Sequence, residues 1–284
     1  MKKKEIYFRS SSFGNLMTES SKVLITEIQL AKLNEFEQRI SANLKPLTDN
    51  QRKEYVSLIE KKNAPPQLSE TAKKEVEKIW RLNEKGYYED LDNKYLTKGL
   101  FNENDGVYLV AKKYGEFCEK NDVRISKNNI TGEADLILNL EGKKVIIDIK
   151  CSWDSKTFMN GELSKIYEYQ LRCYMYLYDA DEAYLCYCLT DTPSHFVANA
   201  KKQQWYKYVY DGMTNEEANL MEEKLQKIYE QIDRNMVYST NPAYSEEEMV
   251  KTYKIVRDKE IEANMLSKIP LAISYYNSIK LNQL

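Results

Sequence analysis

The sequence contains one histidine, His195, and its five cysteines include no Cys-x-x-Cys pair. A zinc site built from several histidines is therefore excluded, and a catalytic triad with a histidine base would have to rely on His195 alone. An odd number of scattered cysteines without zinc-binding spacing is typical of free thiols in a reducing compartment. We therefore expect a cytoplasmic protein.

Long hydrophobic runs and nucleotide-binding loops are also missing. No apolar run is long enough to span a bilayer, and the lysine-rich start shows no features of a secretory signal peptide. The absence of a G-x-x-x-x-G-K-[ST] loop excludes an ATP-driven helicase part. A content of 42% hydrophobic and 30% charged residues over 284 positions suits a soluble globular protein with one large domain or two small ones.

Neither sign of charge dominates, because 42 Lys and Arg residues accompany 44 Asp and Glu residues. With a net charge of -2, any contact with nucleic acid has to use a local basic patch. Tyrosine, in contrast, is abundant, with 23 copies. Many of these will be buried or half-buried, but tyrosine can also contact phosphates and stack on bases.

The most informative stretch is a predicted β-hairpin. Two apolar runs rich in β-branched residues, 130–138 and 145–150, flank the dipeptide Glu141-Gly142, which is typical of a hairpin turn. Symmetric pairing about this dipeptide gives paired residues whose numbers sum to 283. The register of the two strands follows from this turn.

That register brings charged side chains together at the end of two apolar strands. Asp135 lies opposite Asp148, with Cβ atoms roughly 5 Å apart. Lys150 shares the face of Asp148 because it lies two residues further along the strand, and Glu133 would pair with Lys150. The hairpin therefore predicts a cluster of facing carboxylates with one ammonium group.

A salt-bridge ladder on a solvated sheet face is one interpretation of this cluster. It accounts less well for Ile137 and Ile146 on the same face, because a solvated face normally carries polar residues along the whole strand. Two facing carboxylates in a partly buried place repel each other unless a cation lies near them. A hard divalent metal ion with oxygen ligands would remove that repulsion.

The spacing Gly-x-x-Asp ending at Asp135, followed after twelve residues by Asp148-Ile149-Lys150, resembles the core of the PD-(D/E)XK nucleases. Ala134 stands where the proline that gives the family its name would be, and an aspartate in the second acidic position is within the family pattern. The weight of the resemblance comes from the order of the flanking elements.

The flanking helices resemble those of the phage lambda exonuclease branch. A helix with Gly-x-x-x-Glu ending at Glu103 precedes the hairpin, and Leu100, Val107 and Val110 share its apolar stripe. From the spacing alone, Glu103 is an edge residue whose carboxylate extends to solvent or pairs with a lysine. The resemblance implies instead that Glu103 faces a metal site.

After the hairpin, residues 162–178 predict a helix with Gln170 and Tyr174 on one face. The pattern Gln-x-x-x-Tyr at this position resembles a further motif of the same branch. An ordinary amphipathic helix is the alternative, in which Tyr174 serves mainly for packing.

The predicted order is a helix, three strands, a helix and a strand, with residues 123–127 as the first strand and 183–189 as the last. It indicates an α/β fold with a restriction-endonuclease-like core and added helical regions at both ends. We expect a helical N-terminal arm over residues 1–97, the nuclease core over 98–190, and a helical C-terminal region over 191–284 packed on the core.

The resemblance implies a DNA nuclease that depends on magnesium or manganese, an exonuclease for phage recombination or DNA processing that acts on duplex DNA with an end. It implies that Asp135, Asp148 and the carbonyl of Ile149 bind the metal ion, and that Glu103 binds it directly or through water. Lys150 would activate the attacking water. Gln170 and Tyr174 would position the water or the DNA.

Two alternatives stay open from the sequence. A structure-specific endonuclease has the same motifs, because end preference depends on the shape of the groove. A non-catalytic DNA-binding module on the same fold is less consistent with an intact set of Glu103, Asp135, Asp148 and Lys150. The candidate protein partners are a second copy of the chain and a phage recombination protein, and no membrane is expected.

Overall fold

The computed structural model describes residues 5–19, 25–42, 44, 46–63, 67–87, 94–210 and 212–282. The chain forms two compact units. The first consists of Met1–Phe8, Ser12–Tyr88 and Lys259–Leu284, and the second of Arg9–Ser11 and Glu89–Asp258. The short strand β1 (Phe8–Arg9) and the 3-10 turn Ser10–Ser12 lie where the chain passes between them.

The first unit is helical. Its helices are α1 (Phe13–Leu16), α2 (Glu27–Ser41), α3 (Asp49–Asn63), α4 (Glu70–Lys85) and α11 (Lys259–Asn282). Helix α2 begins at a capping box in which the side chains of Thr26 and Gln29 each accept from the other's backbone N–H. From the sequence, a helix is expected over about residues 19–40, and part of that range lies outside the described residues. Helix α2 packs on α3 through a small core around Leu33, Phe36 and Leu58.

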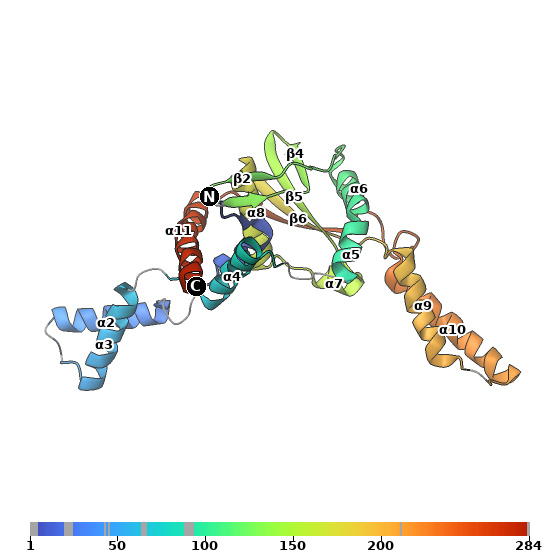
Figure 1. Ribbon diagram of the computed structural model, residues 1–284, viewed down its shortest axis with the longest axis horizontal. Helices are drawn as coiled ribbons and strands as arrows, with labels where there is room; N and C mark the ends of the chain where they lie inside the picture. The colour runs from blue at the N-terminus through green and yellow to red at the C-terminus, as the bar shows by residue number, and fades with distance from the viewer. Residues whose placement is uncertain are drawn as a thin grey trace. The chain divides into compact units, whose positions relative to one another are not determined.

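The second unit combines helices with two sheets, and this confirms the predicted α/β class with its added helical regions. Its elements are α5 (Lys94–Phe101), α6 (Glu103–Tyr114), β2 (Ile125–Lys127), β3 (Ile130–Gly132), β4 (Leu136–Leu140), β5 (Lys143–Cys151), α7 (Ser155–Asn160), α8 (Lys165–Tyr178), β6 (Glu182–Cys188), α9 (Ser194–Tyr208), α10 (Asn215–Met236) and β7 (Val250–Val256). The larger sheet has the order β4-β5-β6-β7 (Figure 1). Strands β5 and β6 are parallel, and α8 lies in the crossover between them.

The hairpin of β4 and β5 has the predicted register. Leu136 pairs with Ile147 and Leu140 with Lys143, so each pair of numbers sums to 283. Glu141 and Gly142 adopt φ angles of 52° and 77°. Two successive positive φ angles are typical of a type I′ turn, whose twist matches that of the flanking strands.

The first run of the predicted hairpin is not one strand. Residues 130–132 form β3, which pairs with β2 in a separate sheet, and β4 begins only at Leu136. Glu133 lies between the two strands, and its carboxylate is 3.1 Å from Arg124 Nη2. The predicted pair of Glu133 with Lys150 is therefore wrong, because β4 begins only at Leu136 and does not extend back to Glu133.

A strand also lies where the sequence analysis expected only helices. Ser245 and Glu248 cap each other as at a helix start, with the Ser245 N–H donating to Glu248 Oε2 at 2.9 Å. No helix follows, and the chain continues into β7, which pairs with β6 along its whole length. Backbone pairing with a buried strand overrides the local capping signal.

The two faces of the larger sheet are covered by different helices. Side chains alternate along β5, so Asp148 lies on one face and Ile149 on the other. Helix α8 packs on the Asp148 face, where Gln170 contacts Asp148. Helix α6 packs on the Ile149 face, where a Cβ on Gly106 would come within 2.8 Å of Ile149 Cγ2. A glycine at position 106 therefore permits the close approach of α6 to the sheet.

Gly99 and Glu103 lie on two helices, whereas the sequence predicted one helix for both. Helix α5 ends at Phe101 and α6 begins at Glu103, with Asn102 between them. Leu100, which was expected on the apolar stripe with Val110, is 76% exposed. The break turns Leu100 toward solvent and places Glu103 in the first turn of α6, where the helix dipole favours a carboxylate.

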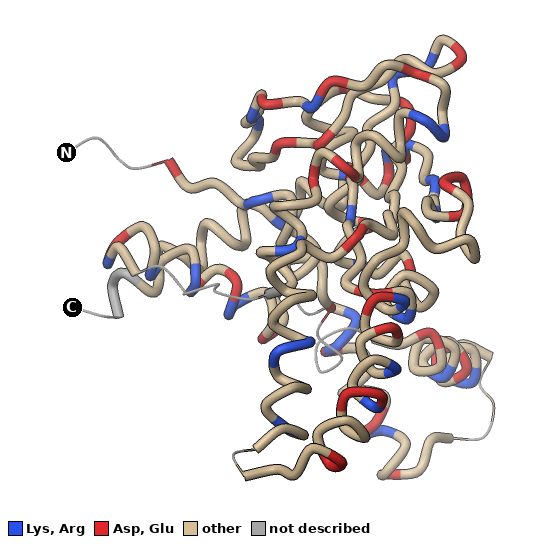
Figure 2. Tube along the Cα trace, turned by 90° about the vertical axis from the view of Figure 1, so that its right-hand side faces the viewer, with Lys and Arg blue, Asp and Glu red and all other residues tan. Residues whose placement is uncertain are grey.

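Acidic and basic side chains are interspersed along the chain trace, as a net charge of -2 implies (Figure 2). Among the described helices, none combines the length and the apolar character that crossing a membrane requires.

The buried Glu182 of β6 joins three of the four strands of the larger sheet, β5, β6 and β7. Its carboxylate lies 2.7 Å from Lys143 of β5 and 2.6 Å from Lys254 of β7. Hydrogen bonds from these two lysines lower the pKa of Glu182 to about 2. Since this pKa is below the ordinary value of 4.5, the stabilisation is fully present above pH 4.5 and is lost as the pH falls toward 2.

We expect Glu182→Gln to lower the free energy of unfolding at pH 7 by roughly 1–3 kcal/mol. The same variant should flatten the decrease of that free energy between pH 5 and pH 2. Denaturant titrations at several pH values measure both effects. Asp233→Asn, which breaks an exposed pair with Lys201 in the same unit, is the matched control and should change little. An unchanged acid dependence in Glu182→Gln would contradict this role.

Candidate active site

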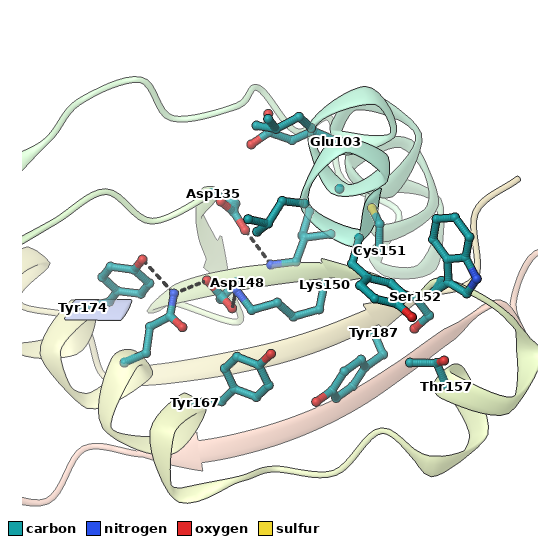
Figure 3. A pocket seen from close by; sticks show the side chains of 17 residues that line it. Glu103, Asp135, Asp148, Lys150, Cys151, Ser152, Thr157, Tyr167, Tyr174 and Tyr187 are labelled. Atoms are coloured by element: carbon teal, nitrogen blue, oxygen red, sulfur yellow. Dashed lines mark hydrogen bonds and ion pairs between the residues drawn. The ribbon is translucent and has the colours of Figure 1, made fainter. Parts of the chain in front are cut away.

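One cavity of about 530 Å³ collects every residue that the sequence analysis predicted for the site. Helices α5, α6 and α8 and the ends of β4 and β5 surround it (Figure 3). The predicted residues in its lining are Glu103, Asp135, Asp148, Ile149, Lys150, Gln170 and Tyr174. Residues up to 71 positions apart in the chain thus meet in one place.

Asp148 lies at the centre of this cavity and is only 2% exposed. Its Oδ1 accepts a hydrogen bond from Gln170 Nε2 at 2.8 Å. Its Oδ2 lies 2.7 Å from Lys150 Nζ, close enough for an ion pair, but accepts no well-aligned hydrogen bond from the described residues. The ion pair offsets the negative charge of Asp148 Oδ2, but it does not supply this oxygen with a well-aligned hydrogen bond.

Asp135 precedes β4 and faces Asp148. Its Oδ2 accepts the backbone N–H of Ile149 at 2.6 Å. Burial, followed by the charge of Asp148, raises the pKa of Asp135 to about 7, although Lys150 and the Ile149 N–H act in the opposite direction. Burial lowers the pKa of Lys150, but Asp148 and Asp135 outweigh it, and the net pKa of Lys150 is raised. Lys150 is therefore a persistent ammonium group between two carboxyls.

Asn121 and Tyr178 hold the segment that carries Asp135. The Asn121 N–H donates to the carbonyl of Asp135, and its Nδ2 donates to the carbonyl of Ala134, both at 2.8 Å. The Tyr178 hydroxyl accepts from the Ala134 N–H at 3.3 Å and donates to the Val123 carbonyl at 2.6 Å. A proline at position 134 would lack the N–H donor, so alanine suits this arrangement.

Glu103 lines the same cavity above Asp135 (Figure 3) but its carboxylate is 2.8 Å from Lys120 Nζ. A pair with a lysine is one of the two arrangements that the spacing alone favoured. Within the described ranges, no three His, Cys, Asp or Glu side chains are arranged around a common ion position. Glu103 therefore contacts a lysine in the structure, and the metal-facing orientation that the family resemblance implied stays a prediction.

The remaining donor atoms suit a hard divalent cation. Two carboxylates face each other, the Ile149 carbonyl follows Asp148 on β5, and oxygen is the ligand that magnesium and manganese prefer. Burial and, second to it, the charge of Asp148 raise the pKa of Asp135, and a nearby cation would act in the opposite direction, as Lys150 does. These carboxylate and carbonyl oxygens are therefore of the chemical type that suits the divalent metal ion that the resemblance implies.

Gln170 and Tyr174 form a short polar chain on α8, which begins at a Ser164 cap. Gln170 Nε2 donates to the Tyr174 hydroxyl at 3.0 Å as well as to Asp148. Tyr174 is 4% exposed, and burial and the nearby Asp148 raise its pKa. The ring of Tyr167 lies under Lys150, with Nζ 5.2 Å from its centroid.

A buried lysine, Lys98 of α5, is a structural residue of the site that sequence reasoning missed. It is fully buried, and its Nζ donates to the carbonyls of Trp153 and Thr190, each at 2.9 Å, and to Thr192 Oγ1 at 3.2 Å. Burial lowers the pKa of Lys98 to about 8. These three bonds tie the cavity wall of α5 to the loops after β5 and β6. In the sequence, Lys98 resembles any solvated helix lysine.

The comparisons with known proteins agree with this geometry. A family profile for the PD-(D/E)XK nuclease superfamily matches residues 31–248. No curated protein sequence matches the chain.

Two solved structures are similar in fold. A phage related exonuclease from Haemophilus somnus 129PT has 21% sequence identity and a TM-score of 0.62, with 99% of this chain and 98% of that chain covered. An alkaline exonuclease from Laribacter hongkongensis has 11% identity and a TM-score of 0.50, with 96% and 88% covered. The profile match spans more than half of the sequence, and the chain therefore belongs to the PD-(D/E)XK nuclease superfamily.

Proposed function

We propose that this protein is a magnesium-dependent DNA exonuclease that processes duplex DNA from an end. The observation that carries the proposal is the single cavity in which Asp135, Asp148, Lys150 and Gln170 meet. The choice of an exonuclease over an endonuclease is supported by the fold of the two similar structures, which are described as exonucleases. Manganese, with similar ligand preferences, should replace magnesium.

The metal ion would be held by Asp135, Asp148 and the carbonyl of Ile149. When bound, it would supply Lewis acidity that lowers the pKa of a water molecule and offsets charge on the phosphate. Glu103 would contribute either through water or after leaving Lys120, because its carboxylate is engaged by that lysine in the structure.

Lys150 contributes a positive charge rather than a basic nitrogen. Its raised pKa keeps it protonated, so its N–H groups can orient the attacking water and offset the negative charge that develops on the phosphate. Asp148 and the ring of Tyr167 hold the ammonium group in place from two sides. Such preorganisation means that no charged group has to reorient during the reaction.

Gln170 acts on the reaction through Asp148. Its amide N–H fixes the orientation of the Asp148 carboxylate, and the amide oxygen is left to accept a hydrogen bond from a water. Tyr174 supports Gln170 from the buried side through its hydroxyl. We assign Gln170 as a positioning residue for the metal ligand and Tyr174 as its support.

The proposal predicts that linear duplex DNA is degraded in magnesium or manganese, whereas covalently closed circular DNA of the same sequence survives. Calcium should permit binding with little cleavage. Gel assays of both substrates with each ion measure this. Efficient cleavage in excess EDTA would refute metal dependence, and cutting of the closed circle would identify an endonuclease.

Asp148→Asn should abolish cleavage, because it removes one of the two carboxylates that face each other. The fold should persist, with a free energy of unfolding within about 1–2 kcal/mol of the wild type without metal, since lost attraction to Lys150 offsets relieved repulsion from Asp135. Cleavage assays and melting curves measure the two effects. Glu133→Gln, outside the cavity, is the matched control and should remain active. A fully active Asp148→Asn protein would exclude this cavity as the active site.

Gln170→Ala should lower kcat roughly 10- to 100-fold, because the orientation of a metal ligand is lost. Tyr174→Ala should instead lower the free energy of unfolding by roughly 3 kcal/mol, because it leaves a cavity beneath α8. Tyr174→Phe is the control that keeps the ring and removes only the hydroxyl. Steady-state kinetics and thermal melts distinguish the two roles. A normal kcat in Gln170→Ala would indicate that α8 contributes to packing alone.

A further inference from the structure

Helix α9 presents large aromatic side chains to solvent. The exposed fractions are 44% for Trp205, 64% for Tyr206 and, just beyond the helix end, 62% for Tyr210. Single exposed apolar residues are common, but neighbouring exposed aromatic residues mark a surface for interaction. The proposed nuclease cavity uses none of these three residues.

The same helix is basic. Its fifteen residues include Lys201, Lys202 and Lys207 and no Asp or Glu. Lys202 and Lys207 are exposed, and Lys202 Nζ lies 5.7 Å from the centroid of the Tyr206 ring. With 3.6 residues per turn, Lys202 and Tyr206 lie on one side of α9, and Trp205 and Lys207 lie on the two flanks of that side.

The side of α9 that carries Lys202 and Tyr206 faces away from α10. Lys201 points toward α10, where its Nζ is 2.7 Å from Asp233, and Val197, one turn earlier, is buried. With 3.6 residues per turn, Lys202 and Tyr206 lie on the opposite side of α9 from these two residues. Helix α10 therefore packs one side of α9 and leaves the aromatic and basic side uncovered within the second unit.

The chemistry of this surface matches a single strand of DNA better than a protein. The cores of protein interfaces are depleted in lysine, whereas here the lysines alternate with the aromatic rings. Single-strand binding surfaces combine rings that stack on bases with cations that contact the backbone phosphates. A duplex offers its base faces only at its ends, so the exposed rings favour a single strand.

Ring contacts connect the start of α9 to the wall of the proposed active site. The centroids of Tyr95 and Trp153, which both line the cavity, are 5.1 Å apart, and Trp153 lies 5.8 Å from Phe196 of α9. From Phe196 to Tyr206, the helix extends about 15 Å. A strand that leaves the cavity along this row would therefore reach the exposed rings.

We propose that the α9 surface formed by Lys202, Trp205, Tyr206 and Lys207, with Tyr210 beyond the helix end, binds single-stranded DNA by base stacking and phosphate contacts. This inference rests on the proposed function, because an exonuclease that digests one strand of a duplex leaves the other strand single. The surface would hold a single strand that is produced at the neighbouring cavity.

The test is binding of an unstructured oligothymidine to the full-length protein in EDTA, followed by tryptophan fluorescence. Binding to the wild type should quench fluorescence, and the Trp205 part of the quench should be missing in Trp205→Phe. The double variant Trp205→Ala/Tyr206→Ala should bind about tenfold more weakly or worse. Leu220→Ala, which removes an exposed side chain of α10, is the matched control and should bind as the wild type does.

The lysines are tested by the salt dependence of the same affinity. Lys202→Gln/Lys207→Gln should reduce the slope of log affinity against log salt by about 1.4, because two phosphate contacts are lost. Lys227→Gln, which removes an exposed positive charge from α10, should leave the slope unchanged. An equal loss of slope in both variants would overturn the proposal of a defined surface.

Two further outcomes would overturn the proposal. One is wild-type oligothymidine affinity in Trp205→Ala/Tyr206→Ala together with a change of oligomeric state, which would make this surface a contact between copies of the chain. The other is cleavage of linear duplex DNA in magnesium without any oligothymidine binding, which leaves the proposed nuclease intact. Oligothymidine binding that requires Trp205 and Tyr206, in a protein that cleaves no DNA, would support this surface and refute the proposed function.

Discussion

The close approach of two carboxyls, the half-buried Asp135 and the buried Asp148, is the constraint around which the candidate site of the second unit is arranged. Burial, followed by the charge of Asp148, raises the pKa of Asp135, although Lys150 and the Ile149 N–H act in the opposite direction. Lys150, the amide of Gln170 and the backbone N–H of Ile149 each supply part of the compensation. A site that remains short of positive charge is suited to a divalent cation, and this connects its stability to its chemistry.

The scaffold holds these groups by covering the sheet from both sides. Helix α8 brings Gln170 onto the face of Asp148, while α6 approaches the other face closely because position 106 is glycine. Asn121 and Tyr178 hold the segment before β4 by its backbone, and Lys98 ties α5 to two loops through three uncharged oxygens. Asn121, Tyr178 and Lys98 therefore help to position the site although none of the three lines the cavity.

Charge is organised locally in this protein. The net charge of -2 and the interspersed charges along the trace give no general attraction for DNA (Figure 2). Contact with a polyanion has to come from limited places, such as Lys150 in the cavity and the lysines of α9. The many tyrosines divide accordingly. Tyr174 and Tyr178 are buried and support the site, whereas Tyr206 and Tyr210 are exposed on or beside α9.

The sequence by itself determined the register of the β4–β5 hairpin and the faces of its residues, because these depend on short-range rules, whereas the place of Glu103 and Gln170 beside the hairpin was implied by the family resemblance. A Glu-Gly turn sets the pairing, strand alternation sets the faces, and an i, i+4 spacing sets Gln170 beside Tyr174. Only the tertiary structure decided that β7 forms after an apparent helix cap, that Glu103 pairs with Lys120, and that Lys98 is buried. Each of these depends on a partner distant in the chain, and a local pattern contains no information about such a partner.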